Sequence, residues 1–167
     1  MQGKILLIED EQYARDIYKR QLDLAGFTTD AFPNGKEGLA ALANKYDLAL
    51  IDLMLPDVNG VEILKQIKAN ESSKNTAVVF LTNLGQDSLI KEGFSLGIVA
   101  YLVKSNYTPN QLVQEVQNIM TKVSSSASQT TVPVQAPQTP IASPGSPVAP
   151  TLASPTPTPP QGINSTQ

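Results

Sequence analysis

Reactive side chains end several apolar runs of this sequence. Glu9 and Asp10 follow ILLI, Asp52 follows LALI, Thr82 follows VVFL and Lys104 follows AYLV. The chain contains no His and no Cys, which excludes imidazole bases, imidazole metal ligands and thiolate nucleophiles. Three carboxylates gathered in a partly desolvated place repel one another, and a hard divalent cation with oxygen ligands relieves that repulsion. The set therefore predicts a site for Mg²⁺, with Mn²⁺ as the alternative.

The same residues favour phosphoryl transfer, which depends mainly on positioning and charge neutralisation. Lys104 supplies a cation for the transferred group, and Thr82 supplies a hydroxyl for one of its oxygens. Without His or Cys, the expected nucleophile is a carboxylate, which would form an acyl phosphate. Asp52 stands alone at the end of its run, whereas the adjacent acids near the N-terminus suit a shared metal role. We therefore expect Asp52 to be the phosphoacceptor and the backbone carbonyl of Met54 to be a further metal ligand.

The apolar runs are predicted to be the strands that position these side chains. They cover residues 4–8, 27–32, 48–53, 77–81 and 99–103, and segments of helical period separate them. Strict strand–helix alternation, with strands apolar on both faces, predicts a parallel sheet covered by helices on both sides. Because the carboxyl ends of parallel strands meet at one edge, the reactive side chains are expected to converge there.

The helical segments differ in how regular their apolar spacing is. The period i, i+3, i+4, i+7 occurs in two of them, and the last segment, which opens at Thr108-Pro109, carries a longer apolar stripe. These positions are Leu39, Leu42, Ala43 and Tyr46; Gly60, Ile63, Leu64 and Ile67; and Leu112, Val113, Val116, Ile119, Met120 and Val123. The segment 86–96 is the least regular.

The distribution of charge divides the chain into a domain and a tail. All 12 Lys and Arg and all 15 Asp and Glu lie between Lys4 and Lys122, whereas residues 123–167 hold 10 of the 13 prolines. We expect a folded domain at 1–122 and a disordered, uncharged Pro/Ser/Thr/Gln-rich tail at 123–167. The tail contains PxxP spacings, but no Arg or Lys lies near them, so a Pro-rich ligand is the less favoured interpretation.

Composition also narrows the expected partners and location. The net charge of −3 gives no basic footprint for direct nucleic-acid binding. No apolar run approaches the length of a membrane span, and the N-terminus is acidic by residue 9, too early for a signal peptide. The absence of Cys fits a reducing compartment, so we expect a cytoplasmic protein without a membrane partner.

Four segments in fixed order, ILLIEDE, LALIDLMLPDVNG, VVFLTN and AYLVKS, resemble the receiver domain of two-component response regulators. The resemblance covers about residues 2–122. It implies a flavodoxin-like (βα)5 fold, a doubly wound parallel five-stranded sheet of order 2-1-3-4-5. It also implies a stand-alone phosphorelay protein that is no enzyme beyond its own phosphorylation and autodephosphorylation.

The family pattern assigns roles to the matching acids. The resemblance implies that Asp10 binds Mg²⁺ directly and that Glu9 binds it through water. Asp52 would accept the phosphoryl group from the phosphohistidine of a histidine kinase or phosphotransfer protein. Glu9 is a mild departure from the family pattern, in which Asp is commoner at this position.

The resemblance further implies a switch. Thr82 and Lys104 would be drawn toward the phosphoryl group, and the rotamer of Tyr101 would change with Thr82. The face made by the fourth helix, the fifth strand and the fifth helix would then bind a protein target. Two departures bear on this switch: Ser105 follows Lys104, where the family typically has a cis proline, and Asn83 is larger than the usual residue after the switch hydroxyl.

Several alternatives remain open at this point. Asp52 could be a strand-end cap, and Tyr101 could be a packing residue. A docking protein could keep the fold without the chemistry. A Mg²⁺-dependent phosphohydrolase would also use an aspartyl phosphate, but it usually has a second Asp where this chain has Met54. A flavin or dinucleotide carrier would need a Gly-rich loop after the first strand, and none is present.

Overall fold

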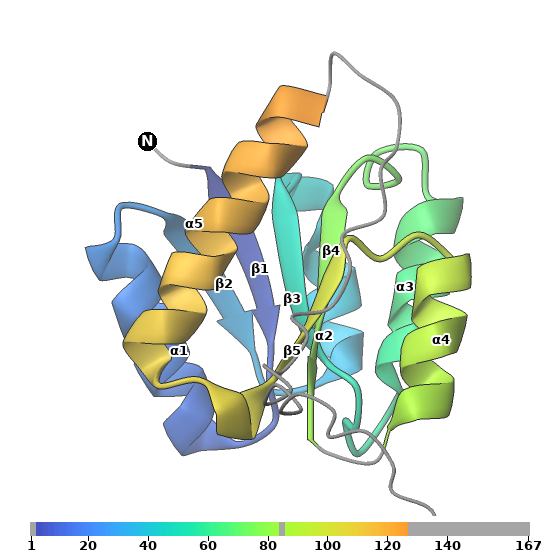
Figure 1. The fold of residues 1–167 in the computed structure, drawn as a ribbon. Coiled ribbons are helices and arrows are strands. Elements are labelled where there is room, and N and C mark those ends of the chain that lie inside the picture. Colours follow the sequence, from blue (N-terminus) through green and yellow to red (C-terminus); the bar gives the residue numbers. More distant parts are fainter. Residues whose placement is uncertain (1–2, 84–85, 127–167) are drawn as a thin grey trace, which may run out of the picture. The chain divides into compact units, whose positions relative to one another are not determined.

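The computed structural model describes residues 3–83 and 86–126 of the chain (Figure 1). One sheet holds five strands: β1 (Lys4–Ile8), β2 (Thr28–Phe32), β3 (Leu48–Asp52), β4 (Ala77–Thr82) and β5 (Ala100–Val103). Every neighbouring pair is parallel, and the strand order is β2-β1-β3-β4-β5. The predicted doubly wound, flavodoxin-like sheet is therefore confirmed.

Helices follow the strands in alternation. They are α1 (Gln12–Leu24), α2 (Gly35–Ala40), α3 (Gly60–Ala69), α4 (Asp87–Ser95) and α5 (Pro109–Ser126), with 3₁₀ turns at Ala41–Asn44 and Lys104–Asn106. Helix α5 continues past the expected domain end at residue 122, and residues 127–167 of the predicted tail lie outside the described residues. None of the helices in the described ranges combines the length and apolar character needed to cross a bilayer.

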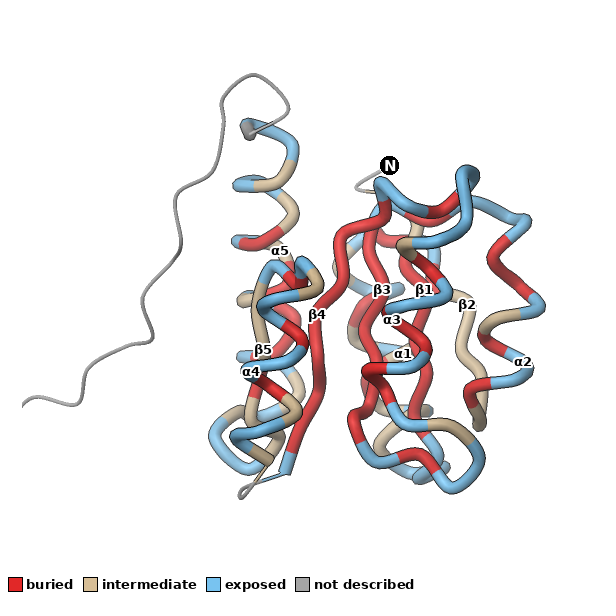
Figure 2. Tube along the Cα trace, turned by 90° about the vertical axis from the view of Figure 1, so that its right-hand side faces the viewer, coloured by how far each residue is buried: buried red, intermediate tan, exposed pale blue. Residues whose placement is uncertain are grey.

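Two hydrophobic cores sandwich the sheet, and successive residues of a strand alternate between them. The α1/α5 core joins strand residues to helices α1 and α5; it includes Ile5, Leu7, Leu48, Leu50, Val79, Leu81, Leu102, Leu22, Leu112 and Val116. The α2–α4 core lies on the other face; it includes Leu6, Ile8, Ala49, Ile51, Val78, Phe80, Leu42, Ile63, Ile67 and Ile90. The central strands β3 and β4 are buried throughout, as Figure 2 shows in red. Apolar runs without polar alternation thus reflect burial on both faces.

The expected helix through Tyr46 is wrong. Helix α2 ends at Ala40, the 3₁₀ turn that follows it ends at Asn44, and the next residue, Lys45, has a left-handed φ of 53°. Tyr46 is buried on the approach to β3, where its hydroxyl donates to Asp30 at 2.8 Å. Its helical spacing was therefore a consequence of burial in the same core rather than of a continuous helix. The predicted apolar faces of α3 and α5 are confirmed, because the described positions on them are buried or half-buried.

Candidate functional site

The parallel register brings three of the predicted side chains to one face of the sheet. Ile8 pairs with Ile51, so Glu9 stands level with Asp52 at the carboxyl ends of β1 and β3. Glu9, Asp52 and Lys104 each follow by two residues a member of the α1/α5 core, namely Leu7, Leu50 and Leu102. Since side chains alternate along a strand, all three project on the α1/α5 side of the sheet edge.

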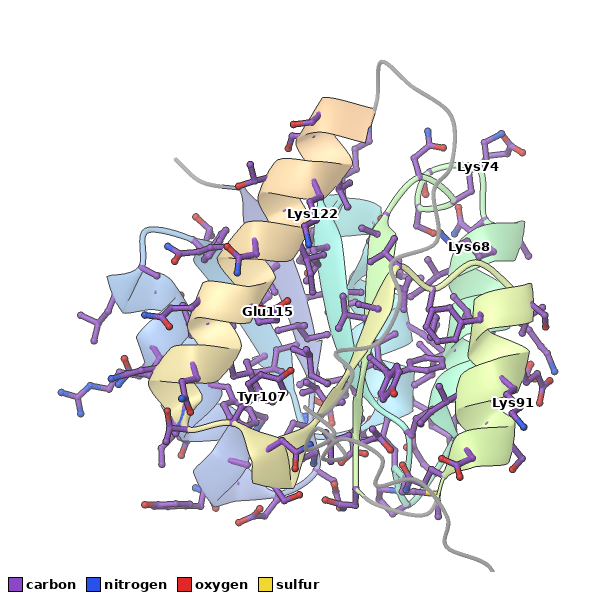
Figure 3. The ribbon with its side chains drawn as sticks, in the orientation of Figure 1. Lys68, Lys74, Lys91, Tyr107, Glu115 and Lys122 are labelled. Carbon is purple, nitrogen blue, oxygen red and sulfur yellow. The ribbon has the colours of Figure 1, made fainter. Side chains whose placement is uncertain are left out.

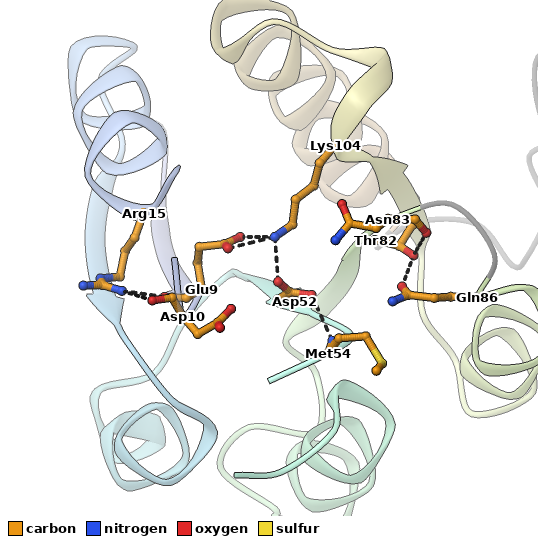
Figure 4. Close-up of polar contacts among 9 residues, drawn as sticks. All are labelled: Glu9, Asp10, Arg15, Asp52, Met54, Thr82, Asn83, Gln86 and Lys104. Atoms are coloured by element: carbon orange, nitrogen blue, oxygen red, sulfur yellow. Dashed lines mark hydrogen bonds and ion pairs between the residues drawn. The ribbon is translucent and has the colours of Figure 1, made fainter. Parts of the chain in front are cut away.

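A buried ion-pair network joins these residues (Figure 4). Lys104 Nζ donates to Asp52 Oδ2 at 2.6 Å and to Glu9 Oε1 at 2.8 Å. The Glu9 side chain is 0% exposed, that of Asp52 is 4% exposed and that of Lys104 is 15% exposed. One ammonium therefore neutralises two carboxylates that are almost entirely withdrawn from water.

Burial and pairing shift the ionisation of this network in opposite ways. Burial raises the pKa of Glu9, and the neighbouring carboxylates of Asp52 and Asp10 add to the rise against the opposing pull of Lys104. Burial acts to lower the pKa of Lys104, but its hydrogen bonds to Asp52 and Glu9 outweigh that effect and raise it. Lys104 is thus firmly protonated, whereas burial favours the protonated form of Glu9.

The acidic residues fit a hard divalent cation. Carboxylate oxygens of Glu9, Asp10 and Asp52 lie within 4.8 Å of one another. Glu9 Oε2 stands 2.7 Å from Lys104 Nζ at ion-pair distance, yet it is buried and accepts no hydrogen bond within the described part of the chain. A buried, unsatisfied oxygen beside two further carboxylates suits Mg²⁺, and the exposed side chain of Asp10 leaves room for water ligands.

Two backbone contacts fix the loops that carry the acids. The guanidinium of Arg15, in the first turn of α1, donates from Nη1 to the carbonyls of Glu9 at 2.8 Å and Asp10 at 3.0 Å. The backbone N–H of Met54 donates to Asp52 Oδ1 at 2.9 Å, which orients the carboxylate. Reasoning from the sequence missed Arg15, because nothing in its helical spacing indicates that it reaches back to β1. The predicted role of the Met54 carbonyl stays a prediction.

Thr82 belongs to the opposite side of the sheet edge. It follows Val78 and Phe80 of the α2–α4 core at even spacing, so alternation directs it away from the face of Asp52. Its side chain is fully buried, and Oγ1 is hydrogen-bonded to Gln86 Oε1 and, at 2.8 Å, to the carbonyl of Asn83. Among the described residues, the hydroxyl makes no hydrogen bond to the ion-pair network.

Tyr101 lies on the same side as Thr82. Its half-buried ring packs against the α2–α4 core and meets the ring of Phe94 in α4 edge-on, with centroids 6.0 Å apart and planes at 87°. This arrangement puts the aromatic ring between β5 and α4. Its coupling to Thr82 stays a prediction.

The departures at positions 83 and 105 leave the network intact. Lys104 reaches both carboxylates although Ser105 follows it. The exposed Asn83 directs its side chain toward the side of the site on which Lys104 lies (Figure 4). The Asn83 side chain can therefore contact a group that approaches Asp52.

Comparisons with known proteins agree with this geometry. A family model described as the response regulator receiver domain matches residues 5–117. The transcriptional regulatory protein ResD of Bacillus subtilis is 32% identical over 125 residues, which cover 74% of this chain and 50% of ResD. The transcriptional regulatory protein SrrA of Staphylococcus aureus is 29% identical over 134 residues, which cover 80% of this chain and 54% of SrrA. The chain thus spans about half the length of these relatives.

This chain also matches nearly the whole length of two solved structures of similar fold. The chemotaxis response regulator CheY4 of Vibrio cholerae is 27% identical, with a TM-score of 0.63 over 70% of this chain and 98% of that one. The BeF3-activated receiver domain of DrrB is 28% identical, with a TM-score of 0.61 over 72% of this chain and 99% of that one. The described domain therefore has the fold of both proteins.

Proposed function

Because the chain belongs to the response regulator receiver domain family, we propose that it relays a signal by accepting a phosphoryl group on Asp52. The observation that carries the proposal is the buried carboxylate of Asp52, held at 2.6 Å by Lys104 at the carboxyl end of β3. A strand-end cap would not need an ammonium and two further acids around it. The constellation supplies a nucleophile, a cation and metal ligands within one site.

The donor in this proposal is the phosphohistidine of a histidine kinase or phosphotransfer protein. An oxygen of Asp52 attacks phosphorus, a P–O bond forms, the P–N bond breaks, and the released imidazole takes up a proton from water. Glu9, Asp10, Asp52 and the carbonyl of Met54 would hold Mg²⁺, which when bound neutralises charge on the phosphoryl oxygens. The protein would catalyse only its own phosphorylation and dephosphorylation.

During transfer, the ammonium of Lys104 follows the negative charge. It pairs with Oδ2 of Asp52 in the unmodified protein and would then contact the phosphoryl group. Thr82 would contribute its hydroxyl to a phosphoryl oxygen, and Tyr101 would move with it. Phosphorylation adds roughly −1.5 to −2 charges, which is enough to redistribute these contacts.

We propose that the output surface is the face of α4, β5 and α5. Phe94 and Val99 are apolar side chains exposed there by 45% and 38%. Figure 3 shows Lys91 on α4 and Glu115 and Lys122 on α5, so the helices of this face also carry charged side chains. A face that combines exposed apolar and charged side chains suits a protein partner. Direct binding of nucleic acid or membrane is not part of the proposal, and a cytoplasmic location follows from the kinase donor.

The test is phosphorylation of the full chain by acetyl phosphate or a donor kinase with Mg²⁺, followed by intact-mass measurement. We expect a gain of one phosphoryl group in the native protein and in Asp57→Asn, whose acid is exposed and outside the network. Asp52→Asn should show no gain. If neither donor modifies the native chain, the docking-protein interpretation replaces this one.

A further inference from the structure

Gln86 occupies the start of α4 without capping it. It is the N-cap residue of that helix, yet its side chain accepts no hydrogen bond from the backbone of the first turn. Its Oε1 instead accepts the hydroxyl of Thr82, at the carboxyl end of β4 (Figure 4). The Gln86 amide therefore ties a strand end to the following helix through one buried hydroxyl.

This contact engages a hydroxyl that strand alternation already places on the side of the sheet edge away from Asp52. Thr82 projects toward the α2–α4 core, whereas Asp52 and Lys104 project on the α1/α5 side. A threonine hydroxyl has one proton, so Gln86 Oε1, the carbonyl of Asn83 and a phosphoryl oxygen would compete for it. Donation to a phosphoryl oxygen must therefore draw the proton away from these two acceptors.

We propose that Gln86 is a positioning residue that keeps the Thr82 hydroxyl turned away from Asp52 until a phosphoryl group is present. This inference rests on the proposed function. A phosphoryl oxygen is charged and so is the stronger acceptor. The free energy gained from its hydrogen bond is reduced, however, by the cost of breaking the bond to Gln86. Releasing that bond also frees the N-cap residue of α4, so the strength of one hydrogen bond sets how readily the site signals to that helix.

The inference predicts the sign of a substitution effect. Gln86→Leu keeps the size of the side chain but removes the acceptor, and so raises the energy of the unmodified state alone. The net contribution of such a hydrogen bond corresponds to a change of about 2- to 12-fold in an equilibrium constant. The variant should therefore bind a phosphoryl analogue more tightly by about this factor. A merely structural role would weaken binding or leave it unchanged.

The experiment titrates the full chain with beryllofluoride in the presence of Mg²⁺ and follows backbone amides by NMR. Gln86→Leu should bind more tightly than the native protein, and Gln86→Asn, which is one methylene shorter, should show the same direction. Gln66→Leu is the matched control on an exposed position of α3 and should bind like the native protein. In the ligand-free Gln86→Leu variant, amides of α4 should move part of the way toward their positions in the bound state.

A double-mutant cycle shows whether the effect passes through the hydroxyl. Thr82→Val removes the donor at nearly constant shape, so adding Gln86→Leu to it should leave the affinity for beryllofluoride unchanged. The inference is overturned if Gln86→Leu binds no tighter than the native chain, or if it gives the same gain in the Thr82→Val background. Failure of the native chain to bind beryllofluoride or to be phosphorylated would instead overturn the proposed function.

Discussion

Replacing Lys104 by alanine tests the electrostatics of the site most directly. The substitution would leave Glu9 and Asp52, exposed by 0% and 4%, without the ammonium that now lies 2.6 to 2.8 Å from their oxygens. Removing one partner of a buried ion pair costs about 3 to 5 kcal/mol, because the remaining charge stays desolvated. The exposed Asp10 admits water to one side, so we expect a loss near the lower limit, about 3 kcal/mol.

Mg²⁺ should restore much of this loss. The metal would neutralise the same carboxylates, and a ligand present at 100 times its dissociation constant stabilises the folded state by about 2.7 kcal/mol. Because Lys104→Ala removes a positive charge beside the metal, Mg²⁺ should bind the variant at least as tightly as the native protein. The switch response to phosphorylation should be lost, since no cation then follows the phosphoryl group.

Urea unfolding followed by circular dichroism, with EDTA or with saturating Mg²⁺, measures both effects. A pH of about 8 limits proton uptake by Glu9, whose pKa is raised by burial and which would otherwise lessen the loss. Lys65→Ala is the matched control, because it breaks an ion pair with Glu92 at 3.0 Å in which both side chains are 46% exposed. That control should lose no more than about 1 kcal/mol. Equal losses for the two variants, or no recovery with Mg²⁺, would refute the reasoning.

Three further substitutions probe the scaffold of the site. Arg15→Ala removes the two hydrogen bonds to the backbone carbonyls of Glu9 and Asp10, and calorimetry should show Mg²⁺ affinity reduced by about tenfold or more; unchanged affinity would deny Arg15 a positioning role. Gly60→Ala would put a Cβ 2.9 Å from the carbonyl oxygen of Asp52, and urea unfolding should show a loss of about 1 to 3 kcal/mol; a stabilised variant would contradict this contact. Burial acts to raise the pKa of Asp57, but hydrogen bonds from the backbone N–H groups of Gly35 and Lys36 outweigh it and hold that pKa below 3.8. The stability that Asp57 contributes is therefore complete above this value and lost as pH falls through the lower folded-state pKa. Native protein and Asp57→Asn should then converge in urea unfolding only as pH falls below 3.8; parallel pH profiles of the two proteins would contradict this contribution.

The sequence was sufficient for the sheet and for the convergence of its charged residues. Runs such as LALI and VVFL predict doubly buried strands because no polar residue interrupts them, and parallel strands leave their carboxyl ends at one edge. Helix α3 was predictable for the related reason that its buried positions repeat at helical spacing. The error at Tyr46 arose because a residue entering a strand can share the core with the preceding helix.

Contacts that depend on the reach of a side chain were not predictable. Arg15 donates to the carbonyls of Glu9 and Asp10 because the turn into α1 brings its guanidinium back over β1, and no spacing rule encodes that path. Gln86 likewise leaves its own helix uncapped to bond Thr82. One available signal was overlooked: simple alternation along β4 already separates Thr82 from the face of Asp52.

The charge of the site gives a physical reason why the ion-pair network would be coupled to Thr82 and Gln86. Glu9, Asp10 and Asp52 with Lys104 carry a formal charge of −2 when all are ionised, so a divalent cation brings the unmodified site to neutrality. Phosphorylation adds roughly −1.5 to −2 charges at the position that Lys104 already serves. The lysine cannot remain equally close to Glu9 and to the new oxygens. Arg15 reaches only backbone carbonyls, and among the described residues no other cation is ion-paired with these carboxylates. Under the proposed function, neutral donors would therefore be recruited, and the proposed donor, the Thr82 hydroxyl, is the one that Gln86 holds at the start of α4. In this proposal, charge added on one face of the sheet would thereby favour a rearrangement of α4, which covers the other face.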